Sequence, residues 1–266
     1  EDWATSRGSS FTALLIPNVY GPFCKPFYNS VVATFCYQLA NGVECKVLDD
    51  VELNLIFVNE LVDFILEFIK NKINNSLNRQ MVHSIYVPSS STIFVSELLC
   101  KLQHIASGYL KFGIYPKFSD SFTVNLFNTF LTYVNIDKFF PFMLRSNTDS
   151  RGAFTELMRL ESGGQVSFSS TVPGVTRGEH FHTRKIERFM VLSGKARVQL
   201  RKIGTEFVQS FEVDGRQPAF IDMPVWFTHN ITNIGEEPLL TLFWINEPFD
   251  PKDSDTFFEK VNNKQA

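Results

Sequence analysis

Three histidines and one glutamate in the second half of the chain have a spacing that suits a single site inside a β-structure. His180 and His182 lie two residues apart, Glu187 follows five residues later, and His229 lies further along the chain. Residues two apart on a strand point to the same face, so both histidines face inward if Phe181 faces outward. A turn can return the Glu187 carboxylate to the same interior, and a distant antiparallel strand can supply His229. The alternative is that these are core or surface groups that lie near one another in the sequence by chance.

The ligand types indicate a divalent metal ion. Imidazole and carboxylate groups suit Zn²⁺, Fe²⁺, Mn²⁺, Ni²⁺ or Co²⁺, and affinity rules alone do not choose among these ions.

The sequence around these residues favours β-structure. From about Asp149 onward, short β-prone runs alternate with turns that contain glycine or proline. Many short strands at close spacing are typical of an all-β barrel or jelly roll. The expected strands are 165–171, 188–192, 196–202, 206–213, 219–222 and 239–245.

The first half has a different pattern, in which strand-like and helix-like runs alternate. Strands are expected at 11–16, 53–57 and 82–87, and helices at 60–73, from Asn29 or Ser30 to near Gly42, and from a Ser96 cap to Gly108. Such alternation indicates an α/β layer structure. Apolar residues at helical spacing in 120–134 predict a further helix that connects the two halves, with its aromatic residues in the core.

The bulk properties are those of a soluble globular protein. The chain has 266 residues, 44% hydrophobic residues and a formal net charge of -3, with no basic excess to suggest nucleic acid as a partner. The longest apolar stretch, 54–69, is interrupted by polar and charged residues, so we expect no membrane span. Four cysteines without a CxxC spacing indicate buried thiols and a cytoplasmic protein.

The metal-ligand pattern resembles the two sequence motifs of the cupins. Gly174, five residues, His180, one residue, His182, four residues, Glu187, six residues and a final glycine match the first motif without a departure. The second motif is matched by residues 215–233, which include His229. It departs where Trp226 replaces the usual glycine and where the spacing from glycine to proline is longer. The resemblance implies a cupin β-barrel with His180, His182, Glu187 and His229 as metal ligands.

Flanking segments narrow the resemblance to one family, the bifunctional capsular polysaccharide enzymes of the CapF (WbjC) type. The similar segments are 149–156, 164–167, 173–178, 191–195, 223–225, 228–231 and 244–251. Residues 17–22 and 25–30 resemble the late strand and substrate loop of an extended short-chain dehydrogenase/reductase (SDR). The resemblance implies a truncated SDR-like α/β domain at 1–118, a connector helix and linker at 119–148, and an all-β cupin (double-stranded β-helix) at 149–266.

What the resemblance implies for function is epimerisation at C3 of a UDP-4-keto-6-deoxy-2-acetamido-hexose, on the way to UDP-N-acetyl-L-fucosamine. The expected metal is Zn²⁺, the expected substrate a UDP-sugar, and the expected assembly a homodimer. The family also uses NADPH for a reductase step. No GxxGxxG fingerprint and no Tyr-x-x-x-Lys pair occurs here. We therefore expect neither NADPH binding nor the reductase step in this chain.

Four further residues are candidates for the site. Lys185 lies between two ligands and is the candidate for proton transfer. The alternative is that it is a solvated surface lysine. A histidine that the metal does not use would be a competing base. Arg177 is a candidate for the substrate diphosphate, or a rim arginine with no partner. Asn18 resembles a diphosphate contact of extended reductases, or caps the loop after its strand. Trp226 could stack on a sugar or uracil ring, or simply pack against the barrel.

Three other functions stay open at this point. The cupin could be a non-catalytic, metal-stabilised module for dimerisation, which predicts a saturated metal site and no exchange of substrate protons. It could be an iron-dependent oxygenase, which predicts oxygen consumption. Finally, the chain could be a reductase whose nucleotide-binding part is supplied by another chain.

Overall fold

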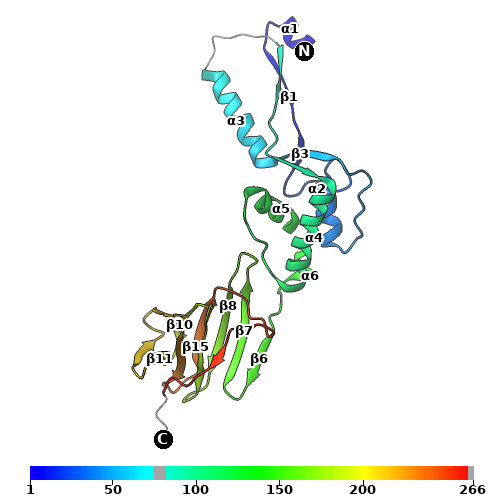
Figure 1. Ribbon diagram of the computed structural model, residues 1–266. Coiled ribbons are helices and arrows are strands. Elements are labelled where there is room, and N and C mark those ends of the chain that lie inside the picture. The colour runs from blue at the N-terminus through cyan, green and yellow to red at the C-terminus, as the bar shows by residue number, and fades with distance from the viewer. Residues whose placement is uncertain (75–81, 263–266) are drawn as a thin grey trace. The chain divides into compact units, whose positions relative to one another are not determined.

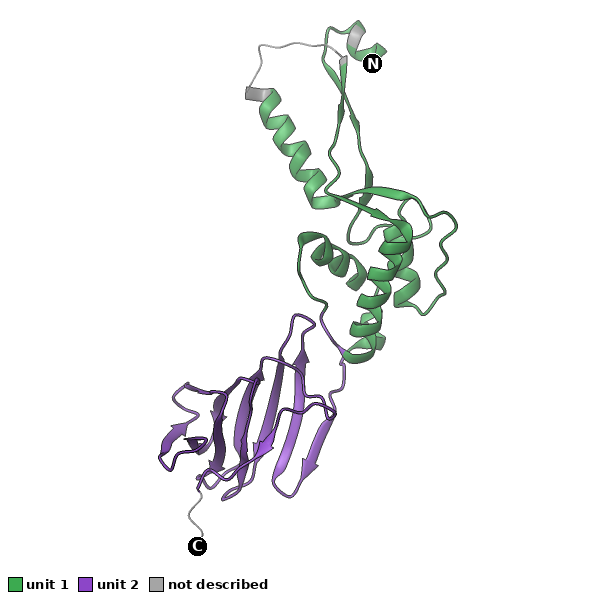
Figure 2. Cartoon of the chain, in the orientation of Figure 1, with its two compact units in different colours: residues 1–112, 116–140 green, residues 113–115, 141–266 purple. Residues whose placement is uncertain are grey.

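The computed structural model describes residues 1–74 and 82–262, and the chain divides into two compact units (Figure 1, Figure 2). Unit 1 comprises residues 1–112 and 116–140, and unit 2 comprises residues 113–115 and 141–266. Among the described helices, none combines the length and the apolar character needed to cross a membrane.

Unit 1 alternates strands and helices, as the sequence predicts. Its elements are α1 (Asp2–Ser6), β1 (Phe11–Leu15), β2 (Asn18–Tyr20), α2 (Val31–Ala40), β3 (Glu52–Phe57), α3 (Val58–Asn74), β4 (Val82–Tyr86), β5 (Ser91–Phe94), α4 (Val95–Phe112), α5 (Ser121–Leu131) and α6 (Ile136–Phe139). The three expected strands are confirmed as β1, β3 and β4. β1 pairs with β4 in parallel, and β3 pairs in parallel with β2 and antiparallel with β5.

The start of helix α2 is the one that the sequence predicts. Ser30 is its N-cap, with its Oγ accepting a hydrogen bond from the Ala33 amide at 3.3 Å. This bond satisfies one of the amide groups that the first turn leaves without a partner. The helix ends at Ala40, and Gly42 follows with φ 68°, a conformation that glycine adopts without strain.

Helix α4 differs from the expectation at both ends. It begins at Val95, and Ser96 does not cap it, because the Ser96 hydroxyl donates to Asp50 Oδ2 at 2.8 Å. It continues through Gly108 to Phe112. Glycine costs roughly 1 kcal/mol inside a helix, and the buried face of α4, which packs against α2 and α5, offsets this cost.

Helix α5 belongs to the core of unit 1 instead of connecting two domains. Leu126, Phe127 and Phe130 are buried, and the helix packs against α2 and α4. The aromatic stripe is therefore core, as expected. The segment 119–148, expected as connector and linker, is divided by the structure, since residues 116–140 lie in unit 1 and the residues from Pro141 onward lie in unit 2.

Unit 2 consists of two antiparallel sheets, which confirms the predicted cupin or jelly-roll type of fold. Its strands are β6 (Ser146–Asp149), β7 (Gly152–Arg159), β8 (Gln165–Thr171), β9 (Thr176–Phe181), β10 (Glu187–Ser193), β11 (Lys195–Lys202), β12 (Val208–Asp214), β13 (Phe220–Met223), β14 (Phe227–Asn233), β15 (Leu239–Ile245) and β16 (Phe257–Phe258). The strand orders are β13-β10-β15-β8-β7-β6 and β12-β11-β14-β9-β16. All six runs expected as strands overlap strands of unit 2, with 206–207 and 219 lying before the strands that follow them.

An apolar core fills the interior of unit 2. Its buried residues come from strands of both sheets: Phe189, Val191, Ala196, Val198, Leu200, Met223, Ile231 and Leu239. Strands β10 and β14 contribute to this core, and β9 pairs with β14.

Candidate metal centre

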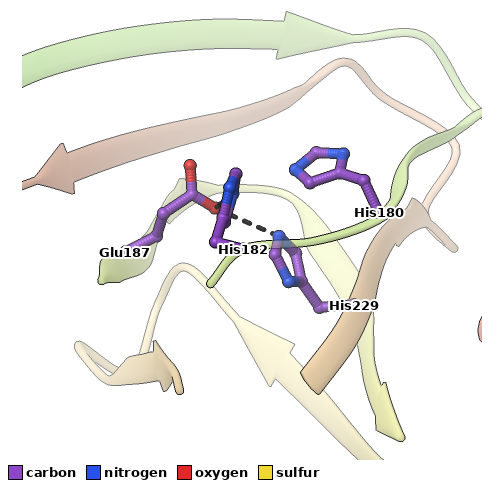
Figure 3. Close-up of side chains that lie close together, drawn as sticks. All are labelled: His180, His182, Glu187 and His229. Carbon is purple, nitrogen blue, oxygen red and sulfur yellow. Dashed lines mark ion pairs between the residues drawn. The ribbon is translucent and has the colours of Figure 1, made fainter. Parts of the chain in front are cut away.

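The four predicted ligands come together from three strands of unit 2. His180 lies near the end of β9 and His182 directly after it, Glu187 opens β10, and His229 lies on β14. β14 pairs antiparallel with β9, with His229 opposite His180. One ligand atom of each residue lies within 4.8 Å of those of the others, and the side chains point toward a common centre (Figure 3).

The facing atoms of this cluster are buried and lack hydrogen-bond partners among the described residues. They are His182 Nε2, His229 Nε2 and Glu187 Oε2. The carboxylate oxygen lies 3.0 Å from His229 Nε2 and 3.4 Å from His182 Nε2. Buried polar atoms are rarely left unpaired in folded proteins, and either a proton on one imidazole or a cation at the centre would pair these atoms.

In two of the imidazoles, the hydrogen bond made by Nδ1 determines which ring nitrogen can bind a metal. His182 Nδ1 lies 2.5 Å from the Asp255 carbonyl oxygen, and His229 Nδ1 lies 3.2 Å from the Phe227 carbonyl oxygen. A carbonyl oxygen can only accept a hydrogen bond, so Nδ1 carries the hydrogen in both rings. In the neutral form of each ring, Nε2 then carries a lone pair. Two bare nitrogens and a carboxylate oxygen then face one another, and a divalent cation fits this set of donors.

The electrostatics of the cluster favour the metal-binding states of His180 and Glu187, whereas they favour a proton on His182. Burial, together with the nearby His229, lowers the pKa of His180 to about 4, so this ring is neutral at neutral pH. Burial alone would raise the pKa of Glu187, but its contacts with His182 and His229 outweigh burial and hold that pKa well below its usual range. For His182, burial acts to lower the pKa, and the Glu187 carboxylate outweighs it and raises the pKa. A bound cation would replace the proton that Glu187 otherwise holds on His182.

Trp226, which stands where the second motif usually has glycine, has a left-handed backbone. Its φ is 63°, its amide donates to the His182 carbonyl at 2.8 Å, and its ring stacks on Phe181 with centroids 5.6 Å apart. The side chain is 51% exposed. The turn therefore needs the conformation that favours glycine. The stacked ring offsets part of the strain, which explains how the departure is tolerated next to a ligand.

Lys185 is buried, so the alternative of a solvated surface lysine is wrong. Its Nζ donates to the Ser254 carbonyl at 2.8 Å, lies 3.8 Å from Glu247 Oε1, and sits over the Phe249 ring. Within the described part of the chain, no hydrogen bond or ion pair joins Lys185 to the four cluster residues. A role in proton transfer stays a prediction and requires release of the ammonium from Ser254.

The remaining candidates lie apart from the four ligands in the hydrogen-bond pattern. Arg177 on β9 donates from Nε to Thr171 Oγ1 at 3.1 Å and from Nη2 to the Ser170 carbonyl at 3.2 Å, so the alternative of an arginine without a partner is wrong. Asn18 is exposed at the start of β2 in unit 1. Its side chain forms no hydrogen bond with a described residue, which argues against the loop-capping alternative. The substrate roles of both residues stay predictions.

The sequence patterns missed one residue of the site, Asp255. It belongs to the segment after β15, which returns to the loop that joins His182 to Glu187 (the ligand loop). The Asp255 carbonyl orients His182. An aspartate in a turn-rich segment has no periodicity or motif that would single it out, because its role depends on residues about seventy positions earlier in the chain.

Comparison with known proteins agrees with this fold. Residues 147–257 match the family model described as the polysaccharide biosynthesis C-terminal domain. Crystal structures of CapF, the capsular polysaccharide assembling protein of Staphylococcus aureus, superpose with a TM-score of 0.83 at 35% identity, over 98% of this chain and 69% of CapF.

Two curated proteins are also similar. The UDP-2-acetamido-2,6-beta-L-arabino-hexul-4-ose reductase of Pseudomonas aeruginosa is 30% identical over 91% of this chain, which spans 63% of the reductase. The spore coat polysaccharide biosynthesis protein SpsL of Bacillus subtilis is 28% identical over 42% of this chain and 81% of its own length.

Fold and site together define a cupin-type protein with a His/Glu cluster that could hold a metal ion. The similarity to CapF over nearly the whole chain also shows the family: the chain belongs to the CapF family of capsular polysaccharide proteins.

Proposed function

We propose that unit 2 is a metal-dependent epimerase that acts at C3 of a UDP-4-keto-6-deoxy-2-acetamido-hexose. The observation that carries this proposal is the convergence of two bare imidazole nitrogens and a carboxylate oxygen at a buried point. Supporting it, the Pseudomonas relative is named for a UDP-linked 2-acetamido-hexulose with a ketone at C4. The hydrogen on the neighbouring C3 is acidic because the resulting enolate spreads its charge onto the ketone oxygen.

We propose Zn²⁺ as the ion, as the family resemblance implies, and the ligand set is compatible with it. His180, His182, Glu187 and His229 would hold it, and a divalent cation in this position would polarise the C4 ketone. Glu187 is ionised and His180 is neutral at neutral pH, so the cluster needs no proton release from these two residues to accept the ion.

Proton transfer at C3 requires a group that is not consumed by the cation. We propose Lys185 for this step, with His180 as the competing candidate, because the described structure shows no ion pair between His180 and Glu187. The Lys185 ammonium contacts the Ser254 carbonyl, the Glu247 carboxylate and the Phe249 ring. In this proposal a side chain removes the C3 proton from one face of the sugar and a proton is returned on the opposite face.

Two residues are proposed for binding the UDP-sugar. Arg177 offers a guanidinium to the diphosphate, with its Nε and Nη2 already held by Thr171 and Ser170. The exposed Trp226 ring offers a stacking face for the sugar or the uracil. In unit 1 we propose Asn18 for a diphosphate contact. The parallel pairing of β1 with β4 and of β2 with β3 supports the related proposal that residues 1–118 are the substrate-binding part of an extended SDR.

The deciding experiment is hydrogen exchange in deuterated buffer with the UDP-4-keto-6-deoxy-2-acetamido-hexose, after the metal content of the purified chain has been measured. We expect deuterium at C3 with the unaltered protein and none with His229→Ala. Bound metal without exchange would contradict the epimerase and favour a non-catalytic cupin that serves for dimerisation. Light scattering on the same sample tests the homodimer that both proposals include.

A further inference from the structure

The Asp255 carboxylate binds the backbone of the loop that joins His182 to Glu187. It accepts hydrogen bonds from three consecutive amides, those of Thr183 at 3.1 Å and of Arg184 and Lys185 at 2.9 Å. The Thr183 hydroxyl donates to the same carboxylate at 2.5 Å. Consecutive amides that point at one anion form a concave anion site of the kind that holds phosphates in other proteins. Here the anion is a side chain of the same protein.

The backbone of Asp255 makes a separate contact with the first ligand of this loop. Its carbonyl oxygen accepts from His182 Nδ1 at 2.5 Å, which leaves Nε2 of that ring facing Glu187. Asp255 has φ 44°, a left-handed conformation that non-glycine residues adopt rarely. This conformation lets one residue direct both its carboxylate and its carbonyl at the same loop.

The two contacts act on both ends of the ligand loop. The carbonyl sets the tautomer and ring orientation of His182, and the carboxylate fixes the path of the chain from Thr183 to Lys185, two residues before Glu187. Since Asp255 is only 6% exposed, water does not readily replace it. Outer partners of this kind commonly decide how well a metal ligand is oriented.

We propose that Asp255 is a positioning residue of the metal centre, which holds His182 and the loop to Glu187 in the geometry that binds a divalent ion. This inference rests on the proposed metal site. It assigns a function to the segment after β15, which is anchored independently at a second place, where Arg201 donates to the carbonyls of Lys260 and Val261. Removal of the Asp255 carboxylate should therefore loosen the ligand loop without releasing the whole segment.

The test is Co²⁺ titration of the full chain, followed by the visible absorption bands that report the coordination geometry of cobalt. Asp255→Ala should bind Co²⁺ about 10–100-fold more weakly than the unaltered protein, with changed bands, because no carboxylate then holds the amides of the loop between His182 and Glu187. Asp255→Asn keeps an acceptor oxygen but loses the charge. Its Co²⁺ affinity should lie between those of Asp255→Ala and the unaltered protein.

Asp253→Ala is the matched control. Asp253 lies on the same segment and pairs with Arg184 of the same loop at 2.8 Å, but its side chain is 67% exposed and does not contact the loop amides. Its removal deletes the same charge, and an exposed ion pair contributes little, so Co²⁺ binding should stay within about twofold.

The outcomes separate this inference from the metal site itself. If the unaltered chain and Asp253→Ala bind no Co²⁺, the metal centre is wrong. If they bind it and both Asp255 variants bind equally well with unchanged bands, the positioning role is overturned. Should Asp255→Ala fail to fold, Asp255→Asn decides alone, and unchanged affinity in that variant overturns the proposal.

Discussion

Gly178 passes so close to His229 that a Cβ atom on it would lie 2.7 Å from the His229 carbonyl oxygen. The contact falls where the pairing of β9 with β14 shifts its register, between His229 and Asn230. Gly178 also has φ 97°, so no other residue type fits the position without strain. The strand that carries His180 and the strand that carries His229 thus approach each other through a glycine.

We expect Gly178→Ala to weaken both folding and metal binding. Gly174→Ala is its control, because Gly174 has φ 74° and open space around its Cβ position. The control should cost about 1 kcal/mol of unfolding free energy from backbone strain alone. Gly178→Ala should cost about 1–3 kcal/mol more because the strands must move apart. Urea unfolding of the two variants measures the difference, and equal losses would contradict the role given to the close approach.

Loss of a ligand should abolish tight metal binding while the fold persists. Glu187→Gln keeps the shape of the side chain but removes the charge, and His229→Ala removes a nitrogen. Each should lower Co²⁺ affinity by more than about 100-fold, since removal of a mere outer partner already costs 10–100-fold. His104→Ala, an exposed histidine of α4, is the control and should bind as the unaltered protein does. Unchanged binding in Glu187→Gln would contradict the proposed ligand set.

Metal affinity should fall as the pH falls, because protons compete for the ligand nitrogens. The pKa of His182 is raised, so its competing proton is present already at mildly acidic pH, whereas His180, with a pKa of about 4, stays neutral there. Titrations with Co²⁺ at pH about 7.5 and 5.5 should show weaker binding at the lower value. Affinity that is independent of pH over this range would contradict the assignment of His182 as a ligand.

Because the backbone of Trp226 is left-handed, a glycine at this position should give a more stable protein than an alanine, the reverse of the usual order. Trp226→Gly and Trp226→Ala both lose the stacking on Phe181, but only glycine also relieves the strain at φ 63°. Trp226→Gly should therefore be more stable than Trp226→Ala by about 1 kcal/mol. Trp244, in the regular strand β15, is the control, since alanine should be the better replacement there. Thermal unfolding of the four variants checks both orders.

Several features of this protein follow from the sequence alone. The strands of unit 2, the Ser30 cap and the spacing of His180, His182 and Glu187 depend on residues close to one another in the chain. Local periodicity and turn chemistry determine such features, and the structure confirms the strands and the cap. The boundaries expected for helix α4 at Ser96 and Gly108 were wrong. Asp50 accepts the Ser96 hydroxyl hydrogen bond, and packing of α4 against α2 and α5 outweighs the local preference of Gly108.

Only the tertiary structure decided how the site is supported. The burial of Lys185, the partners of Arg177 and the hold of Asp255 on the ligand loop all depend on contacts between segments that are distant in sequence. Such contacts leave no periodic pattern, because each is made by a single residue whose partner is set by the path of the folded chain. The sequence determined which four side chains could bind a metal, and the tertiary structure determined which atoms of those side chains face one another and what holds them there.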